Sequence, residues 1–134
     1  RNTRPHWRAY QEIDIQLDPF PAGSATTVTE GLYMERLPVS LKSRPPMGRI
    51  PHGQIAAMGL EEWCVADTEA EYIDKAVAIA ADCRRLVELS SGLRERMRAS
   101  RLMDYRRYGE DAASLYRQMW QAWCERIEHQ RCQK

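Results

Sequence analysis

Two adjacent threonines and a glutamate one helical turn further on are the residues of this 134-residue chain best suited to hold a charged ligand. Thr26 and Thr27 follow a loop of small residues, 22–25, and open a segment with helical character. A helix that begins there directs free N–H groups, two hydroxyls and the positive end of its dipole at one point, which suits a phosphate. Glu30 is placed to accept a hydrogen bond from a ribose hydroxyl. Alternatively, Ser24, Thr26 and Thr27 serve only to cap the helix, as Ser and Thr commonly do.

Short strand-like segments alternate with the candidate helices in the first half of the chain. The predicted elements are strands at 13–17, 37–41 and 63–66 and helices at 28–34 and 49–58. The first strand is expected to stop at Pro19 and Pro21, because proline has no N–H for the ladder, and Gly59 is expected to end the second helix. Strands that alternate with helices predict an α/β fold with a parallel sheet. Ligands of such sheets bind at the carboxyl ends of the strands, where the small-residue loop is expected to lie.

The second half of the chain has no proline after Pro51 and is rich in Ala, Leu, Glu and Arg, which favour helix. Thr68 and Glu71 have the spacing of a capping box that opens a helix reaching Ala80. A further helical region, 82–98, is expected to break or kink near 90–92. The last predicted helix covers about 105–128. Seven of its residues recur at steps of three and four and predict a long buried stripe; they are Tyr105, Tyr108, Ala112, Leu115, Met119, Trp123 and Ile127. The aromatic residues Tyr116, Trp120 and Trp123 are expected to pack this helix across the sheet.

Composition and charge exclude several classes of protein. The chain is 43% hydrophobic and 29% charged, so it is not a disordered or fibrous protein, and its length predicts a single domain spanning 1–134. The net charge of +1 provides no field that would attract nucleic acid or an anionic membrane. No apolar run reaches the roughly 20 residues that span a bilayer. Four cysteines without a CxxC pair are interpreted as reduced thiols of a cytoplasmic protein.

Other candidate ligands have simpler interpretations. A lone loop histidine, His52, is more often solvated or hydrogen-bonded than a ligand, and Arg44 and Arg49 are as readily surface partners as phosphate ligands. Cys124, His129 and Cys132 offer only three zinc ligands at unsuitable spacing, so no metal is expected. The arginines between 94 and 107 are interleaved with acidic residues, which is typical of a solvated helix face and not of a nucleic-acid site.

Several motifs together resemble the SPINDLY-like and O-GlcNAc transferase family of glycosyltransferases. The most specific lie at the start of the chain, where residues 13–21 read IDIQLDPFP, residues 26–34 read TTVTEGLYM, and Pro38 and Val39 follow. Similar segments continue in the family's order at 44–50, 59–63, 71–77, 92–97 and 116–120. The resemblance therefore covers nearly the whole chain.

The resemblance implies a GT-B glycosyltransferase, in which two Rossmann-like halves face a cleft and the C-terminal half holds a UDP-sugar. This chain would be the distal part of that half, a short parallel sheet flanked by helices with long C-terminal helices. By position, Thr26 and Thr27 match residues that bind the diphosphate, Glu30 matches an acidic residue that contacts ribose, and His6 matches a histidine against the uracil ring. With Ala25 of the adjoining loop, these are the expected UDP-sugar-binding residues.

The implied reaction is inverting transfer of a sugar such as N-acetylglucosamine to a protein hydroxyl, without a metal. No catalytic base is identified, and that group and the acceptor-binding repeats are expected upstream of Arg1. The isolated chain is then expected to be an incomplete enzyme and to self-associate, or to fray at its N-terminus, because a narrow sheet leaves an open edge.

Two alternatives remain open. The family often has Asn-Gly or His where this chain has Gly23, Ser24 and Ala25, a lysine of some members falls at Thr3, and Glu35-Arg36 adds a residue after the helix. One alternative is therefore a transferase-like scaffold that has lost catalysis. The other is a GT-B transferase that modifies a small molecule or glycan.

Overall fold

The computed structural model describes residues 6–132 of the chain. A 3-10 helix, η1, opens this part and is followed by a β/α region and then by helices alone. The elements are η1 (His6–Gln11), β1 (Ile15–Leu17), α1 (Thr26–Tyr33), β2 (Leu37–Leu41), η2 (Met47–Arg49), α2 (Ile50–Ala57), α3 (Glu61–Cys64), β3 (Val65–Ala66), α4 (Glu69–Ala81), α5 (Cys83–Ser90), α6 (Leu93–Arg98) and α7 (Tyr105–Cys132).

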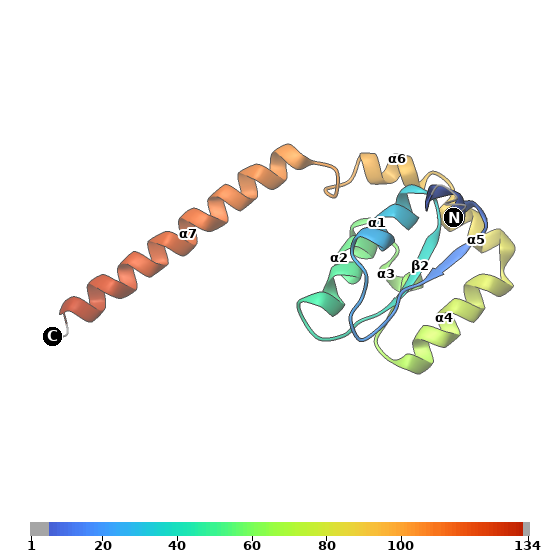
Figure 1. Ribbon diagram of the computed structural model, residues 1–134, viewed down its shortest axis with the longest axis horizontal. Helices are drawn as coiled ribbons and strands as arrows, with labels where there is room; N and C mark the ends of the chain where they lie inside the picture. Colours follow the sequence, from blue (N-terminus) through green and yellow to red (C-terminus); the bar gives the residue numbers. More distant parts are fainter. Residues whose placement is uncertain (1–5, 133–134) are drawn as a thin grey trace, which may run out of the picture.

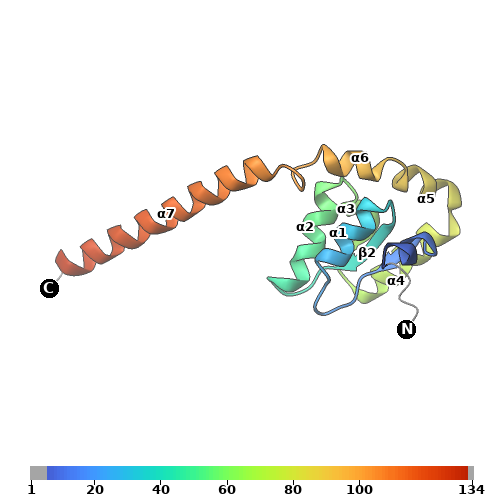
Figure 2. The ribbon, with the colours of Figure 1, turned by 45° about the horizontal axis from the view of Figure 1, so that its top comes forward.

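The three strands form a parallel sheet in the order β1-β2-β3, with β2 in the centre. Ile15 pairs with Leu37 in one half of the sheet, and Ser40 pairs with Val65 in the other. Helices α1 and α2 cover one face, and α4 lies on the other, in the views of Figure 1 and Figure 2. This arrangement confirms the predicted Rossmann-like α/β fold, in which helices on both faces protect a parallel sheet.

The core lies between the central strand and the helices packed on it. Leu37 and Val39 of β2 are fully buried, because a central parallel strand is covered on both faces. Val28 of α1 is fully buried as well. Other core side chains come from α1, α2, α4 and α6 and the segments between them; they include Leu32, Ile55, Met58, Leu60, Ile79, Leu93 and Met97. The core therefore fixes α1, which carries the candidate threonines, against β2.

Helices α1 and α2 end in the same hydrogen-bond pattern with different residues. At the end of α2, Gly59 has a φ of +67°, its N–H donates to Ala56 O, and the next N–H donates to Ile55 O. At the end of α1, Glu35 has a φ of +61°, its N–H donates to Leu32 O, and the next N–H donates to Gly31 O. Both are Schellman motifs, which need a residue in the left-handed region. The predicted C-terminal role of Gly59 is confirmed, and the extra residue Glu35 takes the corresponding place after α1.

Helix α6 is tied to the last turns of α1 and α2 by arginines. Arg94 Nε donates to Tyr33 O at 2.9 Å, and one Arg96 Nη donates to Met58 O at 3.1 Å. The Arg94 guanidinium also lies over the Tyr33 ring, 5.2 Å from its centroid. Cations at helix C-termini satisfy terminal carbonyls and oppose the negative end of the dipole.

Two of the predicted strands are shorter than expected. Strand β2 agrees with the prediction for 37–41, but β1 begins at Ile15 and β3 comprises only Val65–Ala66. Trp63 and Cys64 are helical because their N–H groups donate to Leu60 O, at 3.1 and 2.9 Å. This turn buries Cys64 in the core, a packing that alternation along the sequence does not reveal.

The helical predictions for the middle of the chain are confirmed. Thr68 caps α4, since its hydroxyl accepts from the N–H of Glu71 at 3.1 Å. The Glu71 carboxylate turns back to the N–H of Asp67, one residue before the cap, at 2.8 Å. The predicted break near 90–92 lies between α5 and α6, where Gly92 has a φ of +74°.

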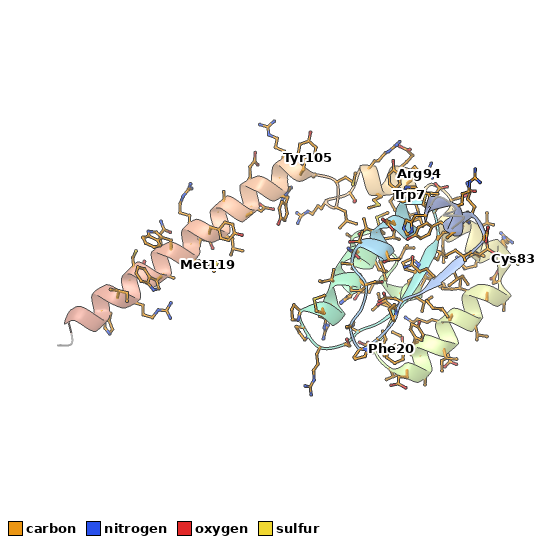
Figure 3. All side chains as sticks on the ribbon, in the orientation of Figure 1. Trp7, Phe20, Cys83, Arg94, Tyr105 and Met119 are labelled. Atoms are coloured by element: carbon orange, nitrogen blue, oxygen red, sulfur yellow. The ribbon has the colours of Figure 1, made fainter. Side chains whose placement is uncertain are left out.

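The prediction of a buried stripe on the last helix is wrong. Helix α7 projects from the α/β body in both ribbon views, and Tyr105 and Met119 stand on it well away from the sheet in Figure 3. Tyr105 is 87% exposed, Trp120 is 63% exposed, and Trp120 stacks on Trp123 rather than on the sheet. Helical spacing correctly predicts an apolar side, but no other element of the described chain covers it. Among the described residues, none of the helices combines the length and the apolar character that a membrane span requires.

Candidate functional site

The loop between β1 and α1 is held by a buried carboxylate. Asp18 directly follows β1, and only 1% of its surface is exposed. One of its oxygens accepts hydrogen bonds from both the N–H, at 2.9 Å, and the hydroxyl of Ser24. The other oxygen accepts from the Ser40 hydroxyl of β2 at 2.7 Å. These bonds fasten the end of the loop to the central strand.

Helix α2 supports the start of α1 from the other side. Gln54 Nε2 donates to Ala25 O at 3.1 Å and to Thr29 Oγ1 at 2.8 Å. Gly23 lies so close to α2 that a Cβ there would come within 2.6 Å of Pro51 Cγ. The carboxyl end of β1, the loop and the N-terminus of α1 are therefore packed into one fixed unit.

The threonines are exposed at the N-terminus of α1. Ala25 is the N-cap residue and supplies no side-chain hydrogen bond to the helix, and Ser24 is bonded to Asp18. Within residues 6–132, neither Thr26 nor Thr27 has a hydrogen bond on its hydroxyl, and both residues are exposed. The first N–H groups of a helix have no partner inside it, so amides and hydroxyls are available together at this end. The alternative that these residues merely cap the helix is wrong.

Glu30 is at the centre of a polar cluster with two residues of η1. His6 Nε2 lies 2.7 Å from Glu30 Oε2, and the Tyr10 hydroxyl donates to the same oxygen at 2.9 Å. The hydrogen bond with His6 lowers the pKa of the Glu30 carboxyl; partial burial opposes this shift, and the bond from Tyr10 and the charge of His6 add to it. Glu30 is thus held as an acceptor of hydrogen bonds.

Tyr10 is the residue of this cluster that the sequence reasoning missed. It is 4% exposed, and its hydroxyl also lies 3.4 Å from the backbone oxygen of Thr27. Burial, the hydrogen bond to Glu30 and the charge of Glu30 raise the pKa of Tyr10 from 10.0 to about 12. Its place four residues after His6, within the segment that precedes β1, was the available signal.

The structure brings four of the five expected residues to one helix and places the fifth beside it. Ala25, Thr26, Thr27 and Glu30 belong to the N-cap and first turns of α1, and His6 approaches Glu30 from η1. The His6 side chain is 62% exposed and meets Trp7 and Tyr10 edge-on, with ring centroids 5.6 Å apart in each case. One imidazole nitrogen is therefore oriented by Glu30 while much of the ring surface remains accessible.

The other candidates have structural partners or no cluster around them. His52 lies in α2 instead of a loop, and its Nε2 is 2.7 Å from Glu61 Oε1. Arg49 Nε donates to Ser43 O at 3.1 Å. Among the residues that the structure describes, no group of three or more His, Cys, Asp or Glu side chains is arranged to hold a metal ion.

Comparison with known proteins gives a consistent set of relatives, although no family model matches the chain. The probable UDP-N-acetylglucosamine--peptide N-acetylglucosaminyltransferase SPINDLY of Solanum lycopersicum is 35% identical over 120 residues, and that of Arabidopsis thaliana is 32% identical over the same length. Each match covers 90% of this chain and 13% of the relative. The UDP-glucose:protein N-beta-glucosyltransferase of Actinobacillus pleuropneumoniae is 27% identical over 82 residues, 61% of this chain and 13% of that protein.

A solved structure agrees with these sequence matches. A mutant of the Thermobaculum terrenum O-GlcNAc transferase superposes with a TM-score of 0.77 and 32% sequence identity, over 85% of this chain and 22% of that one. The chain thus spans about one eighth of the length of the curated relatives named above. The likeness extends to the fold as well as the sequence.

Proposed function

Because the chain belongs to the SPINDLY-like and O-GlcNAc transferase family of glycosyltransferases, of which it matches a C-terminal segment, we propose that the N-terminal end of α1 binds the nucleotide-sugar donor of a protein O-glycosyltransferase. The observation that carries the proposal is the pair of exposed, unpartnered hydroxyls of Thr26 and Thr27 at a helix start within the described residues. The names of the relatives support a UDP-sugar as donor and a protein as acceptor.

The diphosphate would lie against the first turn of α1. Amides of this turn, the hydroxyls of Thr26 and Thr27 and the positive end of the dipole all favour an anion there. Ala25 presents no side chain beyond its methyl group, so the ligand is able to approach the backbone closely at the N-cap.

The nucleoside would lie toward η1. Glu30 has a lowered carboxyl pKa and accepts from His6 and Tyr10 through one oxygen, which leaves its second oxygen for a ribose hydroxyl. The exposed imidazole of His6 offers a flat surface to the uracil ring. Diphosphate, ribose and base thus follow the direction from the N-cap of α1 to η1.

The proposed reaction is an inverting transfer. An acceptor hydroxyl attacks the anomeric carbon as the bond from that carbon to the diphosphate oxygen breaks, and the acceptor proton passes to a base that we do not assign to this chain. Negative charge grows on the departing UDP, where the helix amides and threonine hydroxyls stabilise it. We propose that this stabilisation needs no metal ion. We also propose that the whole protein is cytoplasmic and that it carries helical repeats.

Calorimetric titration of UDP into the full-length protein tests the proposal. We expect binding by the unaltered protein and a loss of affinity of about tenfold in Thr27→Ala and in Glu30→Ala, as for a removed ligand contact. Thr68→Ala is the matched control, because that threonine caps α4 by its bond with Glu71. The proposal is wrong if UDP does not bind, or if both site variants bind it as well as the control does.

A transferase-like scaffold without catalysis is the second candidate. It is favoured by the loop before α1, where Ala25 has no polar side chain and the Ser24 hydroxyl is occupied by Asp18. This candidate predicts an intact fold without UDP binding or sugar transfer, so measured turnover on a protein acceptor would exclude it. Turnover only on a glycan or small molecule would instead support a transferase with a non-protein acceptor, which the names of the relatives do not favour.

A further inference from the structure

We propose that Asp18 is a positioning residue for the nucleotide-sugar, because its carboxylate determines where the phosphate-binding end of α1 lies relative to the sheet. The inference rests on the proposed function and extends it to a residue that touches no ligand. Asp18 is 1% exposed, so it acts only through the groups bonded to it.

The backbone of Asp18 is anchored independently of its side chain. Its N–H donates to Val39 O of β2 at 2.9 Å, which continues the parallel pairing beyond the end of β1. Its carbonyl accepts from the Tyr72 hydroxyl of α4 at 3.1 Å. The two contacts come from the central strand and from the helix on the far face, so the residue is a fixed point of the sheet.

The side-chain carboxylate of Asp18 links this anchored backbone to the loop before α1. Both the N–H and the hydroxyl of Ser24 donate to one oxygen, and the other oxygen is occupied by the hydroxyl of Ser40. No Lys, Arg or His side chain of the described residues forms an ion pair with Asp18. A buried carboxylate without a counter-ion is stabilised only by its hydrogen-bond donors. The loop conformation in which Ser24 donates to Asp18 is therefore strongly favoured over a displaced conformation.

The bond to Ser24 matters because of what comes next along the chain. Ser24 directly precedes Ala25, the N-cap of α1, and Thr26 and Thr27 follow. Gly23 packs between Asp18 and Pro51, where a Cβ would lie 3.0 Å from Asp18 Oδ2, so the loop has little freedom on its inner side. A small displacement of positioning groups is enough to weaken ligand binding and turnover severely.

The test compares two serines that each donate a hydroxyl to Asp18 but lie on opposite sides of it. In the full-length protein, Ser24→Ala loosens the loop, whereas Ser40→Ala removes a bond within the sheet, where the backbone of Asp18 is already anchored. UDP affinity, the donor KM and the thermal midpoint are measured for both variants and for Asp18→Ala.

We expect the UDP affinity to fall by about tenfold or more in Asp18→Ala and by about threefold in Ser24→Ala, each with a matching rise in donor KM. Ser40→Ala is expected to lower the thermal midpoint while its UDP affinity stays within about twofold of the unaltered protein. If Asp18 had a merely structural role, both serine variants would lose UDP affinity to the same extent, and that result would overturn the inference. If UDP binds and Thr27→Ala weakens its binding, an equal loss of UDP affinity in the two serine variants refutes only the role of Asp18. If UDP does not bind at all, the proposed function fails as well.

Discussion

The imidazole Nε2 of His6 lies 2.7 Å from Oε2 of Glu30, although 24 residues separate the two along the chain. This contact joins η1, which precedes the sheet, to the second turn of α1. Tyr10 strengthens the same junction by donating to the same carboxylate oxygen. A carboxylate that two side chains already orient has less conformational freedom to lose when a ligand arrives.

Replacing Glu30 should make Tyr10 easier to ionise. Burial is the largest cause of the raised pKa of Tyr10, followed by the hydrogen bond and charge of Glu30. In Glu30→Gln we therefore expect the pKa to fall from about 12 toward the ordinary 10.0 without reaching it. NMR of ring-labelled tyrosine measures this titration. Glu61→Gln, which removes a carboxylate bonded to His52 instead, should leave it unchanged.

Glu30 should also make stability depend on pH in the acid range. Its pKa in the folded protein is below the ordinary 4.5, so its contribution to the free energy of unfolding is complete above that value and is lost as the pH falls through the lowered pKa. Urea unfolding from about pH 6 to about pH 3 should show a steeper loss of stability for the unaltered protein than for Glu30→Gln. Parallel pH profiles would contradict this expectation.

A glycine at position 35 should stabilise the protein. Glu35 has a φ of +61°, in a region that costs a residue with a Cβ roughly 1–2 kcal/mol. Because glycine also makes the unfolded chain more flexible, we expect Glu35→Gly to raise the free energy of unfolding by about 1 kcal/mol or less. Glu35→Ala keeps the Cβ and should bring no such gain. Denaturant midpoints of the two variants measure the difference.

Cys64 should be inert to alkylation while the protein is folded. Burial raises the pKa of its thiol to about 12, and nearby Lys75 opposes the shift only in part. Only the thiolate reacts, so iodoacetamide near neutral pH should modify the exposed Cys83 first. Mass spectrometry after digestion reports the order, and denaturation with urea should make Cys64 reactive. Early modification of Cys64 in the folded protein would contradict its burial in the core.

The isolated 134-residue chain should self-associate through α7. Trp120 and Trp123 stack on each other on this helix and are 63% and 47% exposed, and Met119 beside them is 59% exposed. Exposed apolar patches of this kind favour association. Light scattering should show an average mass that rises with concentration, and Trp123→Glu should reduce the rise. Arg117→Glu adds the same residue on the same helix and serves as the control; a concentration-independent monomer would refute the prediction.

The sequence predicted best those elements whose patterns depend on local chemistry. Strand β2 and the capping of α4 by Thr68 agree because alternation and a capping box depend on neighbouring residues. The helical turn at Trp63 and Cys64 was mistaken for strand because both residues favour burial, and burial alone does not distinguish the two conformations. The buried side of α7 could not be predicted, since helical spacing does not state which element covers it.

The candidate site was predictable in its residue types but not in its supports. Thr26, Thr27 and Glu30 follow from a helix start after a loop of small residues. The contribution of Tyr10 depends on η1 folding back over α1, and the burial of Asp18 beside Ser40 depends on the packing of β1 against a different strand. These contacts join residues 20 and 22 positions apart, and only the tertiary fold brings them together.

The arginines of α6 determine which end of α1 remains accessible. Arg94 donates to Tyr33 O at the end of α1, and Arg96 donates to Met58 O at the end of α2, so these bonds hold both helices at the end opposite the threonines. Because a cation stabilises the negative end of the α1 dipole, the positive N-terminal end is the one left open to a charged ligand. In our proposal, α1 is therefore held in place at one end and binds the anionic diphosphate at the other.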